Sequence, residues 1–589
     1  MTRGLTGFLL LGTALALPAP VLAAPARTAL SRQALAAVRM IAVQHGGRHK
    51  PFDSFAREVL DAVTGAPRWG RDDPLATVLA ILADPEHWQQ VPLVAVPYGP
   101  LREPLGLGRK ATHMSYGDLV ASRKLMRMLP PLVQKQQRDE KLSILENETM
   151  DAFQRFVALN GLLEQKLELV PPPPAWPNGP ESPEAIRGPS DRAGSGGMVP
   201  PPSGQGSWLP IGQPDGYPPE RREAFRAGWA ALMDGVRRQD SAAVEGAARG
   251  FADLMRQANP SAYPASWRMT LECFYNASQP FHVARWLYVL AILGLLGALT
   301  SRRRAAAAVG FGALAAGCAV HAGGILTRVI LGGRPPVSNF FETMLWLPFV
   351  AVVLSLILER IYRARYFGMA AALLAALTLT LADFVPLDAS IAPVVAVLRS
   401  NKWLTIHVLT IVGSYGALAL ATVLAHVYGW LYLTRHLPVL SRTGRQTGRD
   451  RAAFNLLGLF LYRVLQVGVV MLASGIMLGA VWANASWGRY WGWDPKETWA
   501  LITLLWYVAL LHGRFAGWIQ GVGVALATIG GFFLLLMTYY GVSFYLVGLH
   551  SYAGGHAKPL PPLLIAYLIA EATFMALVGA VALQRKRLV

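Results

Sequence analysis

The sequence predicts an all-α polytopic membrane protein, in which a signal peptide and a mainly helical extracytoplasmic domain precede about nine transmembrane helices. Of the 589 residues, 53% are apolar and 15% are charged, and from about residue 283 onward the apolar residues gather into long runs. Such runs cross a bilayer when they reach roughly 20 residues. Residues 25–281 contain no run of this length, and arginine clusters lie beside the runs that follow. The first part is therefore expected in water and the second in lipid.

The first 24 residues have the pattern of a secretory signal peptide. Arg3 is followed by an apolar stretch over residues 5–17 and by the small residues Ala23 and Ala24, which suit a cleavage site. An uncleaved anchor helix is the alternative. Both interpretations place the segment that follows outside the cytoplasm.

The exported part divides by composition. Residues 25–170 form a predicted helical domain, because apolar residues recur every three to four positions. Residues 171–219 are rich in Pro and Gly, which favours a linker. Residues 220–281 are again helical and lead into the membrane domain, residues 282–589.

The membrane domain fits nine helices that alternate in direction. Arginine or lysine marks each of the five loops or ends expected on the inner side, and the outer loops have far fewer. This agrees with the positive-inside rule and with an exported N-terminal part, so the C-terminus is expected in the cytoplasm. The predicted helices are 283–299, 305–331, 342–358, 367–385, 403–434, 454–482, 498–512, 518–545 and 563–584.

Two function classes are disfavoured by composition. The net charge of +19 would suggest nucleic acid in a soluble protein, but these arginines flank apolar runs, so no nucleic-acid partner is expected. Cys273 and Cys318 form no CxxC or CxxCH, so the chain is neither a dithiol reductase nor a c-type cytochrome. No disulfide is expected, because Cys318 falls within a predicted membrane helix.

One outer loop, residues 482–499, is unusually aromatic. It contains five Trp and one Tyr within 18 residues, interrupted by Gly. An interfacial aromatic belt is the simplest interpretation, but a belt spreads over many helix ends. Flat rings beside Gly suit the stacking of a large planar ligand. Arg489 and Lys496 offer cations for anionic groups on that ligand.

The run WGRYWGWDPKETWALI resembles the tryptophan-rich "WWD" signature of the haem-handling protein family, which includes CcsA (ResC), CcmC and CcmF. The flanking segments LRSNKWLTIHVLTIVGSYGALALA and GVSFYLVGLHSYAG resemble CcsA most, and the resemblance covers roughly residues 283–589. It implies that the outer loop binds haem b between two histidines, with a second pair in the membrane. The loop residues expected to contact haem are Trp487, Arg489, Tyr490, Trp491, Trp493 and Asp494.

The membrane half contains histidines that match both pairs. His407 and His550 lie at the depth of the aromatic loop, and two imidazoles on opposite faces of one haem would complete its iron coordination. His321 and His512 lie deeper, at roughly 16 and 22 Å below the outer surface. Helix tilt can absorb the difference between these two depths. They match the family's membrane pair, although spacing alone does not select them. His426 is interpreted as structural.

Three further features remain open. The segment PPVSNFFE, residues 335–342, resembles a family motif but also suits helix capping. Glu571 and Arg328 lie within helices, where they either pair or line a cavity. Residues 44–56 are dense in polar residues and weakly resemble a segment of fused ResB–CcsA chains. A solvated loop is favoured there over a metal site.

The resemblance implies cytochrome c maturation in the bacterial inner (plasma) membrane. Haem would be presented at the extracytoplasmic face and attached covalently to the CxxCH of apocytochrome c. The implied partners are apocytochrome c, a ResB/CcsB-like membrane protein that completes a holocytochrome c synthase, a thiol-reducing system for apocytochrome, and membrane lipid. No catalytic residue distinct from the haem-binding residues is expected.

Three alternatives compete with this function. A CcmC-like haem export or delivery protein would lack the synthase step, and detection of thioether bonds would separate it. A transporter of another solute usually shows internal repeats, which are not evident here, and it would lack a Soret band. A structural scaffold for respiratory assembly would not need the four histidines.

Overall fold

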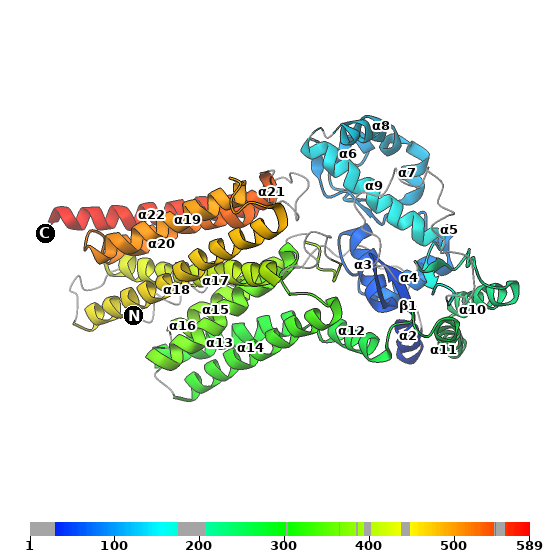
Figure 1. The fold of residues 1–589 in the computed structure, drawn as a ribbon, viewed down its shortest axis with the longest axis horizontal. Coiled ribbons are helices and arrows are strands. Elements are labelled where there is room, and N and C mark those ends of the chain that lie inside the picture. Colours follow the sequence, from blue (N-terminus) through cyan, green and yellow to red (C-terminus); the bar gives the residue numbers. More distant parts are fainter. Residues whose placement is uncertain are drawn as a thin grey trace. The chain divides into compact units, whose positions relative to one another are not determined.

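A computed structural model of the chain describes residues 30–138, 140, 142–174, 207–301, 304–364, 366–384, 387–393, 402–436, 448–546, 548, 550 and 560–588. The described residues form two compact units (Figure 1). The N-terminal unit lies within Ala19–Ser278 and Ser390–Ala396, and the membrane unit within Gln279–Ala389 and Val397–Val589. The predicted signal peptide, residues 1–24, and much of the predicted linker, 175–206, lie outside the described residues.

The N-terminal unit is mainly helical, as expected, and it also contains short strands. Its helices are α2 (Arg32–Arg39), α3 (Phe52–Thr64), α4 (Pro74–Ala83), α5 (Pro85–Trp88), α6 (Gly99–Leu105), α7 (Tyr116–Ser122), α8 (Lys124–Gln137), α9 (Ile144–Leu163), α10 (Pro219–Arg237), α11 (Ser241–Ala258) and α12 (Ser266–Ser278). Residues from before and after the Pro/Gly-rich segment share one hydrophobic core, in which Leu60, Leu159 and Phe251 are buried. Both helical segments therefore fold as a single unit.

The strands pair in two small sheets. The first has the order β2-β1-β5-β6 and the second pairs β3 with β4. The strands are β1 (Ala42–His45), β2 (Arg48–Pro51), β3 (Val94–Ala95), β4 (His113–Met114), β5 (Glu168–Val170) and β6 (Leu209–Pro210). β1 and β2 form an antiparallel hairpin that pairs His45 with Arg48. Gly46 and Gly47 between them have φ of 57° and 76°, which a two-residue turn of this kind requires at both positions.

The hairpin corrects one expectation. Residues 44–56 were expected to form a solvated loop, but they form the end of β1, β2 and the start of α3. Lys50 and Asp53 are buried, at 2% and 0% exposure. Each forms an ion pair, Lys50 with Glu58 and Asp53 with Arg39. Lys50 and Asp53 therefore bond within the fold instead of facing water.

The membrane unit is a bundle of long apolar helices (Figure 1). They are α13 (Pro280–Ser301), α14 (Arg304–Gly332), α15 (Phe340–Tyr362), α16 (Tyr366–Phe384), α17 (Lys402–His436), α18 (Gly448–Trp487), α19 (Pro495–Phe515), α20 (Val522–Leu536), the π-helix η4 (Met537–Gly541), α21 (Val542–Tyr545) and α22 (Pro562–Leu588). Within the described ranges, eight helices are long and apolar enough to span a membrane. The predicted ninth, α19, forms too, but polar residues in its first and last turns lower its hydropathy.

α17 lies at the centre of this bundle. Within the most apolar 18 residues of α17, 78% are buried, whereas the corresponding share in α22 is 17%. Close packing around it depends on small residues: a Cβ on Gly416 would overlap the backbone of Leu347 in α15, and one on Gly468 of α18 would overlap Leu418. Small residues at such contacts let membrane helices approach closely. The central helix is therefore closely packed against α15 and α18. It contains His407, one of the predicted haem ligands.

Candidate functional site

The two predicted outer histidines lie on either side of one tryptophan. His407 is in the second turn of α17, and His550 follows α21. The imidazole of His407 is nearly parallel to the indole of Trp482, with 6.3 Å between ring centroids and 7° between planes. The ring of His550 lies 5.8 Å from Trp482 and 5.7 Å from Trp487. The structure thus brings His407, His550 and Trp487 together, as the sequence predicts.

Each outer histidine is held through its Nδ1 atom. His407 Nδ1 donates to the carbonyl oxygen of Gly475 in α18, at 2.7 Å. His550 Nδ1 donates to Oδ2 of Asp494, at 2.9 Å. A ligating histidine usually donates its second N–H to a carbonyl or carboxylate, which fixes the ring and its tautomer. In this arrangement Nε2 is the nitrogen through which each ring could bind a metal.

Trp482 is not among the haem contacts predicted from the sequence, yet it lies at the centre of this cluster. It is 1% exposed, and its ring meets that of Trp487 at 4.6 Å. Its Nε1–H has no hydrogen-bond partner among the described residues. Buried N–H groups rarely remain unsatisfied, so this donor suits a bound acceptor. Trp482 is one of the five Trp of the aromatic loop, but its position at the end of a predicted membrane helix did not distinguish it from the others.

Residues 488–494 form a short, tightly held turn between α18 and α19. Asp494 and Glu497 make a reciprocal capping box at the start of α19. Oε2 of Glu497 also accepts from the amide of Gly492, at 2.9 Å. Trp493 has φ of 56°, an unfavourable conformation for a bulky residue that surrounding contacts must maintain. The turn is therefore a preorganised feature.

The predicted loop residues fall into two groups. Tyr490 and Trp493 are 60% and 70% exposed, and the Trp493 ring lies perpendicular to that of Trp491 at 5.8 Å. Arg489 is exposed too. Asp494, by contrast, is 6% exposed and binds His550. The exposed rings offer an accessible aromatic surface, whereas Asp494 acts through the histidine.

Lys496 does not project toward the exposed rings. Its Nζ donates to Oγ of Ser543 in α21, at 2.6 Å. Thr343 of α15 binds Tyr539 of η4, with 2.7 Å between their hydroxyl oxygens. These bonds connect α19 and α15 with the η4–α21 segment that precedes His550. His550 is therefore positioned through contacts of this segment with two neighbouring helices.

The structure does not bring His321 and His512 together. His321 in α14 is 0% exposed and lies among the rings of Phe281, Tyr288 and Phe349. Its Nδ1 is 3.1 Å from the Tyr288 hydroxyl. His512 is exposed, and its Nδ1 donates to the Val508 carbonyl at 2.8 Å. α14 packs against α13, α15 and α16, and α19 against α18 and α20, on different sides of the bundle (Figure 1).

Two other buried features of the membrane unit, His426 and the PPVSNFFE segment, are held by ion pairs. Nε2 of His426 lies 2.8 Å from Oε2 of Glu571 in α22, and its ring stacks on Phe574, which agrees with a structural role. Glu342, the acid of the PPVSNFFE segment, forms ion pairs with Arg328 at 3.0 Å and Arg334 at 2.6 Å. Among the described residues, no group of three or more His, Cys, Asp or Glu is arranged to hold a metal ion. Cys273 and Cys318 are free thiols, as expected.

Comparison with known proteins gives a consistent result. Residues 337–550 match the sequence profile of the family described as "Cytochrome C assembly protein". The chain is 36% identical over 248 residues to the cytochrome c biogenesis protein CcsA of Prochlorococcus marinus subsp. pastoris, covering 39% of this chain and 78% of that protein. CcsA of another Prochlorococcus marinus strain is 37% identical over 254 residues, covering 39% of this chain and 79% of the relative.

A longer relative matches the N-terminal unit as well. Protein NrfI of Wolinella succinogenes is 28% identical over 541 residues, which is 87% of this chain. The chain spans about half the length of NrfI, 54%. The combination of an N-terminal unit with a CcsA-like membrane unit is therefore shared with NrfI, which has further sequence that this chain does not match.

Proposed function

The chain belongs to the cytochrome c assembly family of CcsA-like membrane proteins, and from that premise we propose that it binds haem b between His407 and His550 and presents it for covalent attachment to apocytochrome c. The CcsA relatives are named as cytochrome c biogenesis proteins, which agrees with this role. One observation supports the specific site most strongly. Two imidazoles with engaged Nδ1 atoms lie beside one buried indole whose N–H has no described partner.

Haem is the cargo in this proposal, and the residues have separate roles. His407 and His550 bind the iron through Nε2. Trp482 and Trp487 contact the macrocycle, and the Trp482 N–H donates to an acceptor on it. Trp491, Trp493, Tyr490 and Arg489 lie at the exposed side, where apocytochrome arrives. The bundle mainly supplies orientation, which converts a bimolecular encounter into a positioned reaction.

The attachment step needs no further reactant beyond reduced thiols. The histidine of the apocytochrome CxxCH replaces one outer histidine on the iron. Each cysteine thiol then adds across a vinyl group of haem, so that sulfur bonds to one carbon and the proton goes to the other. We propose that a ResB/CcsB-like protein completes the synthase and that a thiol-reducing system keeps the cysteines reduced.

The proposal places the chain in the bacterial inner membrane, with the N-terminal unit and the aromatic loop outside and the C-terminus in the cytoplasm. His321 and His512 would receive haem deeper in the membrane, as in the family. A haem ligated by both would require a rearrangement of the bundle, because the two helices pack on different sides of it. The proposed haem site therefore rests on His407 and His550.

The test uses His407→Ala and His550→Ala, with His436→Ala at the other end of α17 as the matched control. Each protein is purified from cells with ample haem, and bound haem is measured by pyridine haemochrome. Holocytochrome yield is measured in a host without its own synthase, with and without imidazole. We expect both outer variants to lose most of the haem and the yield, and imidazole to restore part of both.

Full haem content in both outer variants without imidazole would contradict the proposed ligands. Wild-type protein that binds haem but forms no thioether, even with its partner, would favour the export or delivery function.

A further inference from the structure

α12 directly precedes the first membrane helix but is not needed to cross the membrane. The helical stretch Ser266–Leu299, which contains the first apolar membrane span, has 34 residues, which would reach about 51 Å as one helix, against a hydrocarbon core of about 30 Å. Gln279, with φ of 44°, separates α12 from α13. α13 alone has 22 residues, enough to span about 33 Å. The 13 residues of α12 therefore lie outside the hydrocarbon core.

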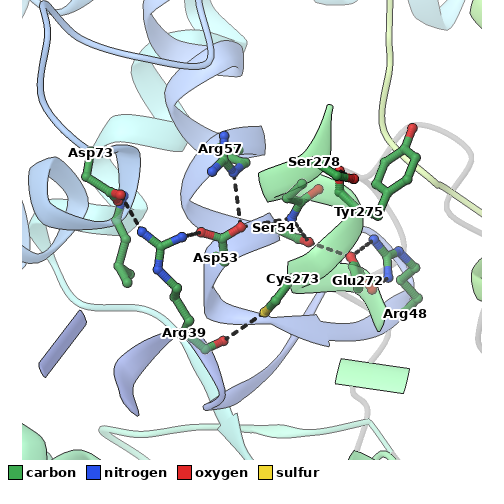
Figure 2. Close-up of polar contacts among 12 residues, drawn as sticks. Arg39, Arg48, Asp53, Ser54, Arg57, Asp73, Glu272, Cys273, Tyr275 and Ser278 are labelled. Carbon is green, nitrogen blue, oxygen red and sulfur yellow. Dashed lines mark hydrogen bonds and ion pairs between the residues drawn. The ribbon is translucent and has the colours of Figure 1, made fainter. Parts of the chain in front are cut away.

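One side of α12 is bonded to the N-terminal unit (Figure 2). Both carboxylate oxygens of Glu272 accept from Arg48 of β2, at 2.8 and 2.6 Å, and Ser54 of α3 also donates to it. Nδ2 of Asn276 donates to Asp53 at 2.9 Å. Asp53 is itself paired with Arg39 and Arg57, so the contact belongs to a larger network. Glu272 and Asn276 thus face inward, whereas Arg268 and Thr270 are exposed.

The opposite side of α12 carries two exposed aromatic residues, whereas Met269 is buried in the core. Trp267 and Phe274 are seven positions apart, and together with Leu271 they lie on one face of the helix. Trp267 is 58% exposed and Phe274 is 67% exposed. A water-soluble helix normally buries its large apolar side chains and exposes its carboxylates, whereas here Glu272 is buried and both aromatic side chains are exposed. Such an outer face requires an apolar environment.

We propose that the face formed by Trp267, Leu271 and Phe274 binds the outer leaflet of the membrane, at the boundary between headgroups and acyl chains. Tryptophan is enriched at this depth, and helices with one apolar face lie there in the membrane plane. Lipid is the occupant that the chain itself indicates, because α12 continues after one residue into a membrane helix. The network around Glu272 holds this face in a fixed orientation on the N-terminal unit.

The experiment uses the full-length protein with Cys273 and Cys318 replaced by Ala, reconstituted in lipid nanodiscs. Spin labels are attached at Trp267→Cys or Phe274→Cys. Ala224→Cys, at an exposed position on α10 of the same unit, is the matched control. Power saturation compares accessibility to oxygen, which partitions into lipid, with accessibility to a water-soluble nickel chelate. We expect the oxygen-to-nickel ratio at positions 267 and 274 to exceed that at 224 severalfold.

Two results would overturn the proposal. A ratio at 267 and 274 equal to that at 224 would show that this face is in water. Low accessibility to both reagents would show that protein covers it, either a second copy or another part of the chain. Because both side chains are exposed in the fold, the substitutions are expected to leave the N-terminal unit intact, and circular dichroism checks this.

Discussion

The two outer histidines differ in the residue that orients each of them. His407 donates to a neutral helix carbonyl, whereas His550 donates to the carboxylate of Asp494. A carboxylate partner makes the imidazole a stronger electron donor to a metal than a carbonyl does. Under the proposed function, His550 would thus be the more basic ligand, and Asp494 would be its positioning residue.

Asp494→Asn is therefore expected to weaken haem binding while preserving the fold. Asparagine caps a helix about as well as aspartate, so α19 should still begin at residue 495. Loss of the carboxylate should lower haem affinity about 10- to 100-fold, as for other outer-shell partners of metal ligands, and should change the Soret spectrum. Haem titration of the purified variant measures this.

Glu497→Gln is the matched control for that variant. Glutamine can also complete a capping box, and the carboxylate of Glu497 accepts from the amides of Gly492 and Asp494, so the haem affinity should stay near wild type. If Asp494→Asn and Glu497→Gln lowered the haem affinity equally, the conformation of the turn, and not the hydrogen bond from His550 to Asp494, would determine haem binding.

Gly479 tests the space around His407. A Cβ at this position of α18 would lie 2.6 Å from Cε1 of His407, so Gly479→Ala must displace the imidazole or separate α17 from α18. Overpacking of this kind costs about 1–3 kcal/mol, and the displaced ring should bind haem less well. Retained haem is measured by absorbance.

Gly579→Ala in α22 is the control for this substitution, because a Cβ there meets nothing within 4 Å. It should leave both stability and haem content unchanged. Wild-type haem content in Gly479→Ala would show that the position of His407 in the fold is not the one that binds haem.

Among the elements, long membrane helices were the most predictable from sequence. The helix predicted at 403–434 is observed as Lys402–His436, because its apolar run is long and continuous. The helix predicted at 498–512 begins earlier, at Pro495. The Asp494–Glu497 spacing, with Pro at the first position, is a capping signal that the sequence contains. The aromatic loop is accordingly shorter than the predicted 482–499.

The short strands were harder to predict, because hydrophobic periodicity carries little information over four residues. β2 reads Arg-His-Lys-Pro, a composition that suggests solvent, and its burial depends on ion pairs with Glu58 of the adjacent α3 and with Glu272 of α12, which lies far away in sequence. Gly46-Gly47 was the available hairpin signal. Trp482 was missed for a similar reason: only the tertiary structure places His407 and His550 around it.

The β1–β2 hairpin gives the N-terminal unit a predicted pH dependence. Burial lowers the pKa of His49 from 6.5 to about 4, and its ring packs on Trp208 at 4.8 Å. Because the unfolded state takes up a proton at a higher pH than the folded state, stability is complete above pH 6.5 and falls as the pH approaches 4. The loss should be about 3 kcal/mol when the pH reaches about 4.

Hydrogen–deuterium exchange of the hairpin peptide in full-length protein, corrected for intrinsic pH effects, measures this loss. The pKa of His45 in the same hairpin is also lowered to about 4, so His49→Asn removes one of two titrating groups and should make the pH profile shallower. His87→Asn, at an exposed position of α5, should not. An unchanged profile in His49→Asn would assign the pH dependence to other groups.

At the scale of the whole molecule, aromatic residues mark both ends of the helix that follows the loop. α19 has 21 residues, a length of about 31 Å that matches a hydrocarbon core of about 30 Å. Tyr490 and Trp493 are exposed just before it, and Phe515 and Trp518, at 88% and 84% exposure, lie at its other end. Aromatic residues at both interfaces are typical of a membrane-spanning segment, so these two ends should lie on opposite sides of the membrane.

The orientation follows from charge. Arg514 lies at the same end of α19 as Trp518, and arginine-rich loops are retained in the cytoplasm, so Tyr490 should face outward. We expect Tyr490→Cys to react with a membrane-impermeant maleimide in intact spheroplasts, and Trp518→Cys only after permeabilisation. Both are made in a Cys273→Ala, Cys318→Ala background, which alone should remain unlabelled. The reverse pattern would place the aromatic loop in the cytoplasm, where exported apocytochrome could not reach haem, and labelling of both positions in intact cells would mean that α19 does not cross the membrane.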